Sequence, residues 1–214
     1  VLGERHPDTL GSMNNTARVL LDKGELDEAL ALFREVLAMC REVLGERHPD
    51  TLISMNNTAS VLKAKGELDE ALALHRKALA LWREVLGERH PDTLGSMNNT
   101  ATVLKAKGEL DEALALHREA LALRREVLGE RHPDTLTSMN NTARVLEAKG
   151  ELDEALTLHR EALAIKREVL GERHPDTLGS MNNTATVLKA KGELDEALAL
   201  FREASGLTDE ETCK

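Results

Sequence analysis

A ten-residue string, VLGERHPDTL, recurs along the chain at a constant interval, and this repetition constrains the fold more than any other feature. The period is 42 residues, and five units occupy 210 of the 214 residues. A fixed period of about 20–50 residues is typical of solenoids, in which each unit buries its apolar face against its neighbours. We therefore expect a single repeat domain over 1–214 without an internal linker. Its expected parts are the units 1–42, 43–84, 85–126, 127–168 and 169–210 and a C-terminal tail, 207–214.

The second unit shows why each unit is predicted to form two helices. Apolar residues recur at intervals of three and four in its first half: Leu52, Met55, Ala59 and Leu62. Asp50 is the expected N-cap, because its carboxylate can accept the unpaired N–H groups of the first turn. Gly66 is expected to end this helix in the left-handed conformation. A second helix then carries a broad apolar stripe: Leu68, Ala71, Leu72, His75, Ala78, Leu79, Trp82 and Leu86. Gly87 is expected to end this second helix.

The repeated pattern LGERHPDTLxSMNNxAxVLxxKGELDEALxLxRxAL resembles the 42-residue tetratricopeptide-type repeat of kinesin light chains and related arrays, and the resemblance covers all five units. Small residues stand where helices cross in that family: Ala59, Ala71 and Ala78. His75 takes a place where the family carries a large aromatic residue, and Phe33 and Phe201 occupy the equivalent place in two other units. The resemblance implies an all-α fold, a right-handed α-solenoid (superhelix) of five helix-turn-helix repeats.

The near-identical units differ mainly on one face of the first helix, at unit positions 11, 18 and 21. The same face carries an asparagine in every unit: Asn14, Asn56, Asn98, Asn140 and Asn182. In arrays of the family that the chain resembles, this face lines a concave groove that holds extended peptides. An asparagine amide both donates and accepts, so this ladder is a candidate for pairing with a peptide backbone. The alternative is that these asparagines only bond neighbouring helices, as we expect of Asn15 and its equivalents.

Charge indicates which peptides the groove would prefer. The net charge is −10, which argues against a general nucleic-acid or anionic-membrane surface, and aromatic residues make up only 1%. Five basic residues nevertheless share the first-helix face: Arg18, Lys63, Lys105, Arg144 and Lys189. Only Glu147 opposes them there. The predicted function is a protein–protein interaction scaffold for an extended acidic peptide. The alternative is a structural array without a ligand. Either could associate weakly end to end with copies of itself, because the fifth unit is cut short after Ala204 and Val1-Leu2 are the stub of a preceding helix.

Nothing in the sequence predicts an enzyme, a cofactor or a metal site. There is no nucleophile elbow, phosphate-binding glycine loop, HExxH or CxxC motif. His75, His117 and His159 recur once per unit, but helices of neighbouring units lie about 10 Å apart, so we expect part-buried core residues rather than ligands. The His-Pro-Asp string is expected to start helices. Cys40 and Cys213 form no disulfide framework, and no membrane span or signal peptide is present, so a cytoplasmic location is predicted.

Overall fold

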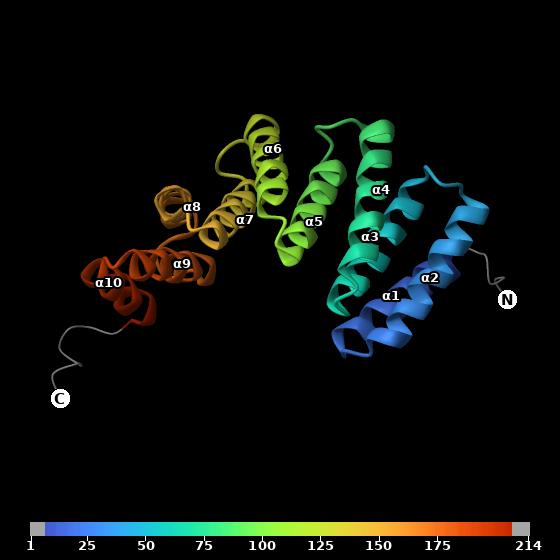
Figure 1. The fold of residues 1–214 in the computed structure, drawn as a ribbon, viewed down its shortest axis with the longest axis horizontal. Helices are drawn as coiled ribbons and strands as arrows, with labels where there is room; N and C mark the ends of the chain where they lie inside the picture. The colour runs from blue at the N-terminus through green and yellow to red at the C-terminus, as the bar shows by residue number, and fades with distance from the viewer. Residues whose placement is uncertain (1–6, 207–214) are drawn as a thin grey trace. The chain divides into compact units, whose positions relative to one another are not determined.

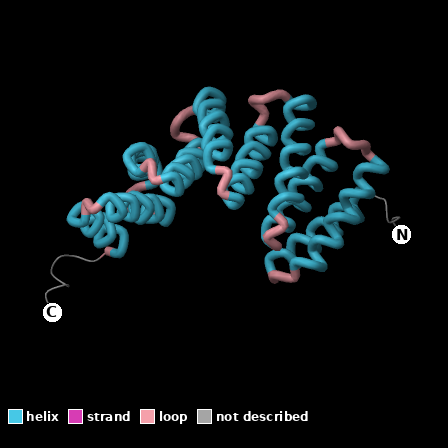
Figure 2. The backbone as a smooth tube through the Cα atoms, viewed as in Figure 1, coloured by secondary structure: helices cyan, strands magenta, loops and turns pink. Residues whose placement is uncertain are grey.

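The computed structural model describes the backbone of residues 7–206 and the side chains of residues 9–206. Within that range all regular structure is α-helical, and helices follow one another in pairs joined by short turns (Figures 1 and 2). The helices are α1 (Pro7–Asp22), α2 (Leu26–Val43), α3 (Pro49–Ala64), α4 (Leu68–Leu86), α5 (Pro91–Lys107), α6 (Leu110–Leu128), α7 (Pro133–Lys149), α8 (Leu152–Leu170), α9 (Pro175–Lys191) and α10 (Leu194–Ser205). The expected all-α fold of helix-turn-helix repeats is confirmed.

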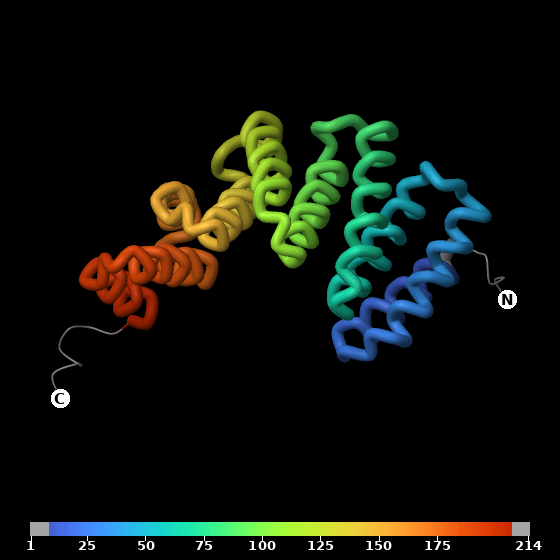
Figure 3. Tube along the Cα trace, in the orientation of Figure 1, coloured from blue at the N-terminus to red at the C-terminus, as the bar shows by residue number. Residues whose placement is uncertain are grey.

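The chain divides into two compact units, one ending at Leu116 and the other beginning at His117, so that the division falls within α6. In the first unit α1 packs on α2, α2 on α3, α3 on α4 and α4 on α5, as the trace in Figure 3 shows. In the second unit α7 packs on α8, α8 on α9 and α9 on α10. Helices adjacent in the sequence are therefore adjacent in space within each unit, as a solenoid requires.

The first helix of a repeat is capped by histidine, and the expectation of an Asp50 cap was wrong. His48 is the N-cap of α3, and its Nδ1 accepts a hydrogen bond from the backbone N–H of Asp50 at 3.2 Å. Pro49 occupies the first helical position, where a missing N–H costs nothing, and it holds its predecessor in the extended conformation that an N-cap needs. The same bond recurs at His90, His132 and His174. The His-Pro-Asp string does start helices, as expected.

The turn between the two helices of a repeat depends on one glycine. Gly66 has φ 81°, in the left-handed region that a side chain disfavours. The backbone N–H of Glu67 then reaches the carbonyl of Leu62 at 2.9 Å and closes the end of α3. The second helix begins at Leu68, and the acidic pair Asp69-Glu70 lies in its first turn.

The apolar stripes of both helices form the core. In the second repeat the first-helix residues Leu52, Met55, Ala59 and Leu62 are fully buried. The second-helix residues His75 and Trp82 are each only 1% exposed. The histidine therefore fills a core position, as Phe33 does in the first repeat.

Candidate functional site

Two of the predicted peptide-binding asparagines bond to other side chains in the first unit. The Nδ2 group of Asn57 donates to Oδ1 of Asn14 at 2.9 Å and so links α3 to α1. The Oδ1 atom of Asn56 lies 3.1 Å from Nδ1 of His75. The expectation that the equivalents of Asn15 bond a neighbouring helix is thus confirmed at Asn57. This bond engages the carbonyl oxygen of Asn14, one of the predicted site residues.

The predicted site residues lie at different depths on one surface, which we term the first-helix face. It consists of unit positions 11, 14, 18 and 21 of each first helix. Asn14, Asn56, Asn98, Asn140 and Lys105 are half-buried, whereas Arg18, Lys63, Arg144, Asn182 and Lys189 are exposed. The exposed cations are within reach of a ligand, and their binding role stays a prediction.

His75 is the buried end of this surface in the second repeat. Burial, together with the nearby Lys63 ammonium group, lowers the pKa of His75 to about 4. Near neutral pH the imidazole is therefore uncharged, and its Nδ1–H tautomer can donate a hydrogen bond to Oδ1 of Asn56.

The fourth repeat arranges the same side chains differently. Here Glu147 stands where the second, third and fifth repeats have lysine, and its Oε1 lies 2.7 Å from Nε2 of the fully buried His159. The opposite ring atom, Nδ1 of His159, is buried without a hydrogen-bond partner in the described structure, and so is Oδ1 of Asn140. This buried, unpaired carbonyl oxygen of Asn140 is a feature that sequence reasoning missed. The isolated glutamate among lysines was the signal.

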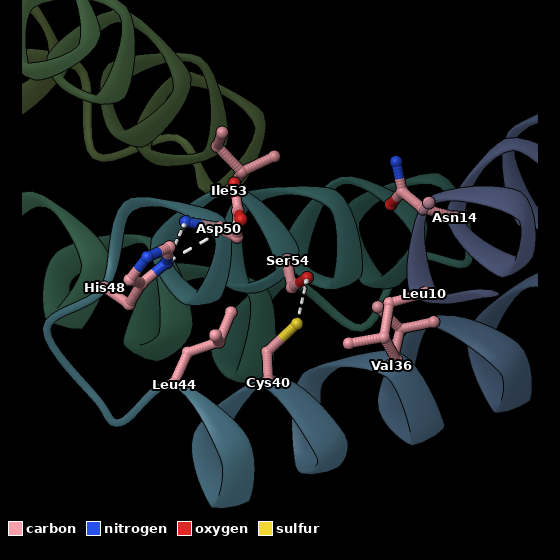
Figure 4. Close-up of a pocket in the computed structure, with 10 residues that line it drawn as sticks. Leu10, Asn14, Val36, Cys40, Leu44, His48, Asp50, Ile53 and Ser54 are labelled. Carbon is pink, nitrogen blue, oxygen red and sulfur yellow. Dashed lines mark hydrogen bonds and ion pairs between the residues drawn. The ribbon is translucent and has the colours of Figure 1, made fainter. Parts of the chain in front are cut away.

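A pocket of about 380 Å³ opens between α1, α2 and α3 (Figure 4). It is lined by Leu10, Gly11, Asn14, Val36, Cys40, Leu44, His48, Asp50, Ile53 and Ser54. Most of this lining is apolar, and Asn14, Gly11 and Ile53 belong to the first-helix face. The pocket therefore adjoins the predicted peptide groove, although sequence reasoning did not predict it.

The pocket exists because one junction position varies among the repeats. That position holds Cys40, Trp82, Arg124 and Lys166 in successive units. Cys40 Sγ lies 3.7 Å from Ser54 Oγ, whereas the longer Arg124 and Lys166 side chains donate to the equivalent serines, Ser138 and Ser180, at 2.6 and 2.8 Å. A thiol is much smaller than an indole or a guanidinium group, so the first junction is left hollow. This substitution was the sequence signal for the pocket.

Other kinds of site find little support in residues 9–206. Burial raises the pKa of the Cys40 thiol, which disfavours the reactive thiolate. No group of three or more histidine, cysteine or acidic side chains in this range is placed to hold a metal ion. None of the described helices combines the length and apolar character of a membrane span. Cys213, Val1-Leu2 and the tail 207–214 lie outside the described residues.

A family model for the tetratricopeptide repeat matches four overlapping stretches, 8–74, 56–125, 97–168 and 143–209. The helix pairs and this match together define a repeat scaffold, and the chain belongs to the tetratricopeptide repeat family. None of the curated proteins matches the chain.

Solved structures agree with this assignment. A Podosopora anserina protein assigned to the kinesin light chains, with nearly identical TPR-like repeats, is 29% identical with a TM-score of 0.85, and the match covers 98% of this chain and 99% of that one. A single-substitution variant of that protein is 28% identical with a TM-score of 0.86, covering 100% of both chains. BtubC (BKLC) from P. vanneervenii is 22% identical with a TM-score of 0.81, over 97% of this chain and 82% of that one, and this likeness concerns the fold alone.

Proposed function

We propose that this chain is a protein-interaction scaffold that binds an extended, acidic peptide along its first-helix face. Tetratricopeptide repeat proteins are generally non-enzymatic scaffolds for protein or peptide partners. The proposal adds the location of the binding surface, the charge of its ligand, a cytoplasmic setting and the absence of a catalytic activity, a cofactor, a nucleic-acid partner and a membrane partner.

The observation that carries the proposal is the pocket beside Asn14. A backbone carbonyl oxygen of an extended segment can accept from the NH2 group of Asn14 while a neighbouring apolar side chain enters the pocket. Such a combination of an apolar hollow with a few placed polar groups is what ligand sites share.

The proposal of an acidic ligand is supported by which basic side chains form ion pairs within the chain and which do not. On the second helices, arginines are paired with glutamates of the next repeat, as in Arg34–Glu70 at 2.7 Å and Arg160–Glu196 at 2.6 Å. On the first-helix face Arg18, Lys63, Arg144 and Lys189 are exposed and form no ion pair with other described residues. The local potential that a peptide meets there is positive despite the negative net charge, and local potential steers binding.

A structural array without a ligand is the alternative function. The near-identity of the repeats outside the first-helix face favours it, because a surface without a partner is under no demand to differ between units.

Peptide binding decides between the two functions. Fluorescence anisotropy with libraries of acidic, neutral and basic peptides should show binding of acidic sequences that weakens as salt rises. The variant Arg144→Glu should lower the affinity about threefold to fivefold, as expected for one exposed charge. Arg173→Glu makes the same charge change on an exposed loop and should leave affinity unchanged.

Three outcomes would count against the proposal. Equal binding of acidic and basic peptides without salt dependence would remove the charge argument. An equal loss in both arginine variants would show that net charge alone matters. Binding of no peptide at all would favour the structural array.

A further inference from the structure

The two ends of the described array expose side chains that the interior repeats bury. Val19 in α1 is 58% exposed, whereas its equivalents are no more than 1% exposed: Val61, Val103, Val145 and Val187. At the other end Leu198 in α10 is 48% exposed, whereas Leu72, Leu114 and Leu156 are each 3% exposed. Leu194, also in α10, is 61% exposed, whereas its equivalents Leu68, Leu110 and Leu152 are half-buried. These residues differ from their equivalents in position along the array and not in type.

The interior junctions show what covers such surfaces. The second helix of one repeat packs on the first helix of the next, as α2 does on α3, α4 on α5 and α8 on α9. The face of α10 is therefore of the kind that receives a first helix, and the face of α1 is of the kind that receives a second helix. Both partners of the junction are present on one chain, at opposite ends.

Charges at the ends are complementary in the same way. A lysine at the end of a first helix bridges two carboxylates at interior junctions, and one of these belongs to the preceding repeat. Lys65 lies 2.9 Å from Asp27 and 2.7 Å from Glu67, and the equivalent bonds of Lys191 to Asp153 and Glu193 are 2.8 and 2.6 Å. Lys107 repeats the pattern with Asp69 and Glu109. In the first described repeat Lys23 meets Glu25, and none of the described residues takes the place of that aspartate. At the far end Asp195 is the equivalent of that aspartate.

We propose that copies of this chain join end to end, with α1 of one copy seated on α10 of another and Lys23 bonding Asp195 across the joint. This interaction goes beyond peptide binding and uses other residues. Because the contact joins two different surfaces, each added copy leaves one face of each kind open, and the assembly is open-ended. A single junction must offset the lost rigid-body freedom, and α10 has 12 residues where α8 has 19, so an affinity of about micromolar or weaker is expected.

Sedimentation equilibrium of the chain 1–214 from micromolar to millimolar concentration tests the joint. The expected result is an average mass that rises continuously with concentration. Val19→Lys places a charge on the exposed face of α1, and Leu198→Glu places one on the exposed face of α10. Each variant should therefore be monomeric, while its circular dichroism stays that of the parent chain. Val127→Lys, at a 44% exposed valine away from both ends, is the matched control and should associate like the parent chain.

Mixing the two end variants gives a sharper result. Val19→Lys copies keep an intact α10 face and Leu198→Glu copies keep an intact α1 face, so an equimolar mixture should stop at a heterodimer. A strict monomer at millimolar concentration would overturn the proposal, and so would unaltered association of either end variant. A closed dimer in both end variants would show that copies meet through another surface.

Discussion

At the scale of single residues, equivalent histidines of two repeats lie in different surroundings. His75 faces the Asn56 amide and stands near the Lys63 ammonium group, whereas His159 contacts the carboxylate of Glu147. Our expectation treated the histidines as equivalent core residues. Burial is indeed common to both, but the group beside the ring differs.

Replacing His75 should flatten the acid response of stability. The folded-state pKa of about 4 lies below the unfolded value of about 6.5, so between these values the unfolded chain takes up a proton that the folded chain does not. The contribution of His75 is therefore complete above pH 6.5 and is lost as pH falls toward 4, by up to about 3 kcal/mol. His75→Phe should remove this decline, and urea unfolding followed by Trp82 fluorescence measures it. An unchanged slope in His75→Phe would contradict the assignment.

At the scale of helices, the histidine cap explains how the repeats start without a serine, threonine or asparagine in the capping position. Proline places its predecessor in extended backbone, and the imidazole Nδ1 of that predecessor then reaches the N–H two residues on. The following aspartate remains in the first turn, where its charge suits the positive end of the helix dipole. The N-cap and the acidic residue of the first turn are thus two different residues of the His-Pro-Asp string.

Removing the cap should cost more than removing the charge. His90→Ala leaves the N–H of Asp92 without its acceptor and should lower the free energy of unfolding by about 1 kcal/mol. Asp92→Asn keeps that bond and should cost less than about 0.5 kcal/mol, the lower range of exposed dipole interactions. Urea denaturation at neutral pH compares the two. A larger loss in Asp92→Asn would restore the aspartate as the principal cap.

At the scale of the whole molecule, the two compact units meet inside a helix rather than at a linker. The prediction of one repeat domain over 1–214 implies that the whole chain unfolds in a single cooperative transition.

Coincident unfolding transitions would support that prediction. Trp82 is the single tryptophan and lies in the first unit, so its fluorescence reports on that unit, whereas far-ultraviolet circular dichroism reports on all helices. Both signals should have the same urea midpoint if the chain unfolds as one domain. Separate midpoints would show two domains, and a measurement below the concentration of self-association keeps assembly out of the comparison.

The sequence by itself determined the period, the helix pairs and the core stripes. These depend on neighbours within one turn of helix or one repeat, such as Leu52 with Met55, or Gly66 at the turn. It also indicated the surface on which the repeats differ. Only the tertiary structure decided that Asn57 bonds Asn14, that Glu147 rather than Asn140 bonds His159, and that Cys40 leaves a pocket. Each depends on which of several polar or apolar groups a side chain meets across a helix interface, and residues 12 to 43 positions apart in the chain compete for that contact. Periodicity places such groups on a common face, but packing chooses between them.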